Sequence, residues 1–132
     1  MNNGQKQTII NYANFFQQLV HKNARLKGLW PELEKFDYSD KEERKLAHQA
    51  VNIPLKTAIA HEEISEAFRA ARKETFEQDK NCPDFSNFAI ELADAVICIV
   101  DFAEATGVSL GEAIIAKMKF NQNRPYRHGK RF

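Results

Sequence analysis

Acidic residues at helical spacing interrupt the most apolar segments of this sequence, and they are the residues best suited to chemistry. On a helix, Glu62, Glu63 and Glu66 fall in one arc about 100° wide, shared with apolar residues that would face a core. Glu91 and Asp94 lie three positions apart in a segment that is otherwise apolar almost all round. Carboxylates that meet in a buried or half-buried place cannot all stay ionised unless cations lie between them.

This acid-only pattern, without histidine or cysteine, suits hard divalent cations. Mg²⁺ and Mn²⁺ take oxygen ligands and keep part of their water shell for a phosphate substrate, so Mg²⁺ is the expected cofactor and Mn²⁺ the alternative. The competing interpretation is a solvated helix face on which the glutamates pair with Arg69, Arg72 and Lys73. The second acidic pair favours the metal site, because Glu91 and Asp94 have few cationic neighbours along the chain.

Helical periodicity predicts the elements that position these acids, and with them an all-α fold. We expect five helices, at residues 5–26, 41–50, 53–73, 87–106 and 110–122, the third ending at about residue 73. The second should be capped by Ser39 or Asp40 and the third by Asn52. The fourth should be capped by Asp84 or Ser86 and the fifth by Ser109. The two acid-bearing helices should be antiparallel within a four-helix-bundle core, with their carboxylates converging at one mouth. The helix ending at Thr106 is apolar around its whole circumference, which predicts a dimer or a dimer of dimers.

Length and composition narrow the class of protein. The 132 residues should form one domain, 1–132, in which 1–38 is a helix with an aromatic connector and 123–132 is a basic tail. A net charge of +1 argues against binding to nucleic acid or to a membrane surface through bulk charge. The longest apolar run, residues 95–100, is too short to span a membrane. Two cysteines, Cys82 and Cys98, without CxxC spacing predict a reducing, cytoplasmic location.

The acidic pairs also carry a resemblance to a known family. Glu62-Glu63-x-x-Glu66 followed by Glu91-x-x-Asp94 resembles the EExxE and ExxD signature of the MazG-like, all-α nucleoside triphosphate pyrophosphohydrolases. Three stretches within about the last eighty residues resemble one small branch of that superfamily: 52–72 (NIPLKTAIAHEEISEAFRAAR), 91–94 (ELAD) and 117–132 (KMKFNQNRPYRHGKRF). Position 62 is often not acidic in that branch, so Glu62 is the weaker ligand candidate.

The resemblance implies a Mg²⁺-dependent hydrolase of phosphoric anhydrides. Members of the superfamily cleave a nucleoside triphosphate between its α and β phosphates, which releases a nucleoside monophosphate and pyrophosphate. By similarity, Glu63, Glu66, Glu91 and Asp94 would hold one or more Mg²⁺ ions and orient the water that attacks the α phosphorus. The residues agree with this chemistry, since carboxylates alone could not bind an anionic substrate without metal.

Positive and aromatic side chains are the candidates for substrate contact. Lys117, Asn121 and Arg124 are spaced to lie near one side of the last helix and its exit, and the resemblance makes them the best candidates for binding phosphate. The basic tail beyond them could equally serve solubility alone. Trp30, in the aromatic connector, is a candidate pocket residue, although aromatic residues at helical spacing are more typical of a core or a dimer interface.

Two other functions stay open at this point. One is the related phosphoribosyl-ATP pyrophosphohydrolase, which uses similar helices on a different substrate. The other is a non-catalytic helical module that binds a nucleotide or a partner protein and keeps the acids for structure.

Overall fold

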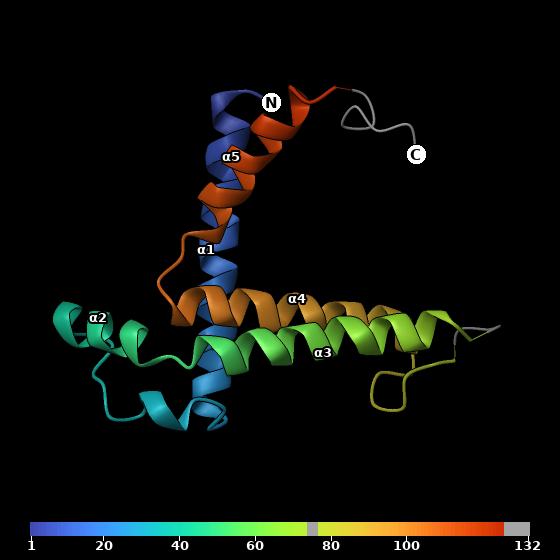
Figure 1. Ribbon diagram of the computed structural model, residues 1–132, viewed down its shortest axis with the longest axis horizontal. Coiled ribbons are helices and arrows are strands. Elements are labelled where there is room, and N and C mark those ends of the chain that lie inside the picture. Colours follow the sequence, from blue (N-terminus) through green and yellow to red (C-terminus); the bar gives the residue numbers. More distant parts are fainter. Residues whose placement is uncertain (74–76, 126–132) are drawn as a thin grey trace.

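The computed structural model describes residues 1–73 and 77–125, which form five α-helices and a 3₁₀ turn (Figure 1). The elements are α1 (Asn3–Leu26), η1 (Pro31–Leu33), α2 (Lys41–Ala50), α3 (Ile53–Ala71), α4 (Asn87–Ala105) and α5 (Leu110–Gln122). An isolated bridge joins Gln78 to Ser86 ahead of α4. The all-α prediction is confirmed for these residues, while most of the predicted basic tail lies outside them.

Several helices begin at side-chain caps that can be identified in the sequence. Asn52 and Ser86 accept backbone hydrogen bonds at the starts of α3 and α4, and Asp40 does so for α2. At the start of α1, Asn2 and Gln5 form a reciprocal capping box, so this helix begins two residues earlier than predicted. Helix α3 ends two residues earlier than predicted, at Ala71.

The helices form two arms rather than one closed bundle within a single chain. Helices α3 and α4 lie side by side and antiparallel, and α1 crosses this pair steeply (Figure 1). Helix α5 packs along the N-terminal half of α1, where a Cβ on Gly111 would lie 2.9 Å from the Ala13 Cβ. The absence of a side chain at Gly111 therefore allows α1 and α5 to approach closely. The acid-bearing helices are antiparallel, as the sequence predicts.

The buried core lies where α1 crosses the C-terminal half of α4 and the connector after α1 folds against both. The connector supplies Trp30, which is 2% exposed, and Leu33, which is fully buried. Many large apolar side chains stay outside this core: Tyr12 is 72% exposed, Phe15 64% and Phe68 62%. Within the described parts of the chain, no helix combines the length and apolar character needed to cross a membrane.

Candidate functional site

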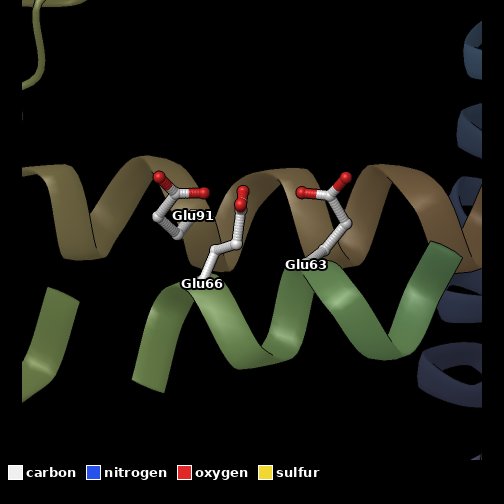
Figure 2. Close-up of side chains that lie close together, drawn as sticks. All are labelled: Glu63, Glu66 and Glu91. Atoms are coloured by element: carbon white, nitrogen blue, oxygen red, sulfur yellow. The ribbon is translucent and has the colours of Figure 1, made fainter. Parts of the chain in front are cut away.

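Three of the predicted acids converge between α3 and α4. Glu63 and Glu66 extend from α3 toward Glu91 on α4, and one carboxylate oxygen of each lies within 4.8 Å of the others (Figure 2). We call Glu63, Glu66 and Glu91 the acidic cluster. All three side chains are half-buried, so the cluster is open to a ligand from solvent. The geometry requires the antiparallel packing of the two helices, because the residues are distant in sequence.

Burial and mutual repulsion both act on the acidic cluster. Burial raises the pKa of Glu63 above its ordinary value of 4.5, and the charges of Glu66, Asp94 and Glu62 raise it further. The pKa of Glu91 is also raised, first by burial and then by the charges of Glu66, Asp94 and Glu63. The cluster therefore holds its negative charge at a cost in free energy, and a cation between the carboxylates would relieve it.

The other two predicted acids lie beside the cluster. Asp94 is exposed, one turn along α4 from Glu91, and lines the same cavity as Glu63. Glu62 is paired with a cation, because its Oε1 accepts a hydrogen bond of 2.9 Å from Arg69. Arg69 also lies 3.0 Å from Glu66 Oε1. Glu62 therefore belongs to a salt-bridged helix face, as in the competing interpretation, while Glu66 both pairs with Arg69 and belongs to the acidic cluster. Neither Glu63 nor Glu91 forms an ion pair with a cationic side chain within the described parts of the chain.

A cavity of about 290 Å³ lies between α3, α4 and the connector; Glu63 and Asp94 line it, whereas Glu66 and Glu91 are not among its lining residues. We call it the α3–α4 cavity. It is lined by Leu29, Trp30, Lys56, Ile59, Glu63, Asp94, Ile97, Cys98, Asp101 and Phe102. A largely apolar cavity with a few polar groups is the usual form of a small-molecule site. The predicted pocket residue Trp30 is among those that line it.

A buried polar network supports the cavity wall at Trp30 and Asp101. The Trp30 Nε1 donates to both oxygens of Asp101, at 3.0 and 2.9 Å, and His21 Nδ1 lies 2.6 Å from Asp101 Oδ1. The His21 and Trp30 rings meet edge to face, with centroids 5.3 Å apart. This network joins α1, the connector and α4 at the cavity wall. Hydrogen bonds to a charged carboxylate are among the stronger ones in proteins.

Lys56 is the cation that lines the cavity. Its Nζ lies 3.6 Å from the centroid of the Trp30 ring and 3.3 Å from the carbonyl oxygen of Leu29. A third neighbour is Glu32 Oε1, at 3.8 Å. The long side chain is therefore held in one place, although it still lines the cavity.

The predicted phosphate-binding residues lie on the other arm of the molecule. Lys117 and Asn121 are exposed on α5 and Arg124 follows this helix, with the Lys117 and Arg124 cations 4.8 and 5.2 Å from the Phe120 ring centroid. The three residues share one side, as expected, but α5 packs on α1 away from the acidic cluster (Figure 1). Within one chain they do not join the acids.

The sequence reasoning missed two charged residues that line the cavity, and the histidine that contacts one of them. Lys56 precedes Glu63 by seven positions, and Asp101 follows Asp94 by seven, so each shares a helix face with a predicted acid. That spacing could have revealed both. His21 had no comparable signal, because its contact with Asp101 joins residues 80 positions apart.

Comparisons with protein-family models, with curated proteins and with solved structures find no match to this chain.

Proposed function

We propose that the protein is a Mg²⁺-dependent nucleoside triphosphate pyrophosphohydrolase of the MazG-like type, cleaving a (d)NTP to the (d)NMP and pyrophosphate. The observation that carries the proposal is the convergence of Glu63, Glu66 and Glu91 from two helices, with oxygens within 4.8 Å of one another. Asp94 supports it, since this fourth carboxylate lies one turn along α4 from Glu91 and lines the same cavity as Glu63.

The donor set fits a hard divalent cation. All the candidate ligands are carboxylate oxygens, they are half-exposed, and their number leaves coordination positions for water and phosphate. Bound Mg²⁺ would neutralise the phosphates and lower the pKa of a coordinated water. The chain's own part is to hold the four carboxylates in place and to offer the α3–α4 cavity to the nucleoside.

Self-association belongs to the proposal. The exposed apolar side chains on α1, α3 and α4 are more than a monomer usually leaves in water, so a second copy covering them is favourable. A dimer or a dimer of dimers would complete the four-helix-bundle core. It would also offer the site Lys117, Asn121 and Arg124 from a neighbouring chain, since α5 does not reach the acidic cluster in its own chain.

Pyrophosphate release from a panel of NTPs and dNTPs with Mg²⁺ tests the proposal. We expect Glu63→Gln and Asp94→Asn to lower the rate about 100-fold or more, because each removes a ligand charge where phosphate charge must be balanced. Glu62→Gln is the matched control, since Glu62 pairs with Arg69. Its rate should stay within about twofold of the unaltered protein.

The outcomes separate the alternatives. Activity confined to phosphoribosyl-ATP would assign the protein to that related enzyme. Nucleotide binding without turnover across the panel would identify a binding module. Equal activity in the folded Glu63→Gln and Glu62→Gln variants would contradict a catalytic role for the acidic cluster.

A further inference from the structure

Two oppositely charged side chains line the α3–α4 cavity at a defined separation along α3. Glu63 and Lys56 lie on the same face of this helix. They are seven residues apart, which corresponds to about 10 Å along a helix axis. This separation is comparable to the length of a nucleoside. A nucleotide whose phosphates lie at the acids would therefore carry its base toward Lys56.

The position of the Lys56 ammonium is set by the surrounding residues. The Trp30 ring lies beneath it at 3.6 Å, and the Leu29 carbonyl accepts one of its hydrogen bonds at 3.3 Å. The Trp30 ring is in turn fixed by two hydrogen bonds to Asp101, whose Oδ1 also contacts His21. Lys56 Nζ also faces Glu32 Oε1 at 3.8 Å, which is beyond hydrogen-bond distance, so an N–H group of Lys56 stays available to a ligand in the cavity. Trp30, Asp101 and His21 are positioning residues for this ammonium.

We propose that Lys56 is a specificity-determining residue, an inference that rests on the proposed function. It selects nucleotides whose base presents a keto oxygen to it over nucleotides whose base presents an amino group. An ammonium has three donors and no acceptor, so a keto oxygen pairs with it and an amino group does not. The carboxylate of Asp101 also lines the cavity, but both of its oxygens already accept from Trp30 and Oδ1 contacts His21, so fewer of its lone pairs are open to an amino group.

Two pairs of nucleotides with rings of matched size test the selection: dUTP against dCTP, and dITP against dATP. Binding is measured calorimetrically with Mg²⁺ and α,β-methylene analogues, which prevents turnover, and pyrophosphate release is measured separately with the natural nucleotides. We expect the keto member of each pair to bind about tenfold more tightly, the value of one charged hydrogen bond. Lys56→Met, which keeps the length of the side chain, should bring each pair to within about twofold by weakening the keto member alone. Lys56→Arg keeps a donor and should retain the preference.

The fluorescence of Trp30 adds a second measurement, because it is the only tryptophan in the chain. Its emission should change on binding of every nucleotide that enters the cavity. Binding without such a change would place the ligand elsewhere and overturn the inference. Equal weakening of all four nucleotides in a folded Lys56→Met variant would also overturn it, since Lys56 would then contact the shared phosphates.

The inference and the proposed function fail in distinguishable ways. Cleavage of all four nucleotides without a keto preference would leave the proposed function standing and remove the inference. Neither binding nor cleavage of any nucleotide would remove both.

Discussion

At the scale of single residues, the site depends on carboxylates kept close together against their mutual repulsion. Glu63 and Glu91 both have raised pKa values, first because of burial and then because of neighbouring acids. A carboxyl group with a raised pKa binds its proton more tightly in the folded chain than in the unfolded chain. Each group therefore stabilises the fold at low pH, and this contribution is lost as the pH rises through the folded pKa.

This linkage predicts a specific pH dependence for the metal-free protein. Its free energy of unfolding should fall as the pH rises through the range just above 4.5, the ordinary pKa of a glutamate. Glu63→Gln should reduce this fall and stabilise the metal-free protein at pH 7 by less than about 1 kcal/mol, because the carboxylates are half-exposed and screened. Urea unfolding at several pH values measures both effects.

Magnesium provides the control for the same prediction. A cation bound by the acidic cluster stabilises the folded state by mass action, so added Mg²⁺ should raise the urea midpoint at pH 7. It should raise the midpoint less in Glu63→Gln than in Glu62→Gln. An equal rise in the two variants would mean that the ion binds elsewhere.

At the scale of elements, the site requires that α4 begins where it does. Ser86 Oγ accepts a hydrogen bond of 3.2 Å from the backbone N–H of Ala89, which starts the helix that carries Glu91. At the start of α5, Ser109 occupies the equivalent position but makes no side-chain cap bond. The Leu110 N–H there donates instead to Gln17 Oε1, across from α1. Both serines were predicted to cap a helix, but only Ser86 forms the side-chain cap hydrogen bond.

The two serines form a matched pair for mutation. Ser86→Ala should lower the free energy of unfolding by about 1 kcal/mol, because it removes a cap that α4 uses. Ser109→Ala should lower the free energy of unfolding by no more than about 0.3 kcal/mol, because Ser109 makes no side-chain cap bond. Thermal or urea unfolding of the two variants measures the difference, and equal losses would contradict the importance of the Ser86 cap.

At the scale of the whole molecule, one chain leaves a large apolar surface uncovered. On α1, a groove lined only by Ile9, Tyr12, Ala13, Phe15 and Phe16 has a volume of about 540 Å³. Tyr12 and Phe15 are its most exposed members. Burying a large apolar side chain contributes roughly 1.5–3 kcal/mol, so contact between two such surfaces favours association.

We therefore expect the protein to sediment as a dimer or larger at micromolar concentration. Phe15→Asp should weaken self-association at least about tenfold, because it places a charge within the apolar groove. Leu46→Asp is the control, since Leu46 is 53% exposed on α2, remote from that groove. Analytical ultracentrifugation distinguishes the outcomes. A monomer at all concentrations, or equal effects of the two substitutions, would contradict an interface on this part of α1.

What the sequence determined by itself is the local part of this protein. The positions of the helices, the caps at Asp40, Asn52 and Ser86 and the shared faces of the acids all depend on residues within a few positions of each other. Helical periodicity and side-chain caps act over one or two turns, so they can be read without knowledge of the fold. The antiparallel arrangement of the acid-bearing helices was predicted as part of the four-helix-bundle core.

Only the tertiary structure decided which of these faces meet. In the fold, Glu91 lies near Glu63 and Glu66, and Glu62 pairs with Arg69. Helix α5, which carries Lys117, packs on α1. It also brought Trp30 and Asp101, 71 positions apart, into the wall of one cavity. Such contacts depend on how apolar faces pack and on which buried polar groups find partners. No spacing along the chain encodes these choices, because they are made between segments that approach each other only in the folded state.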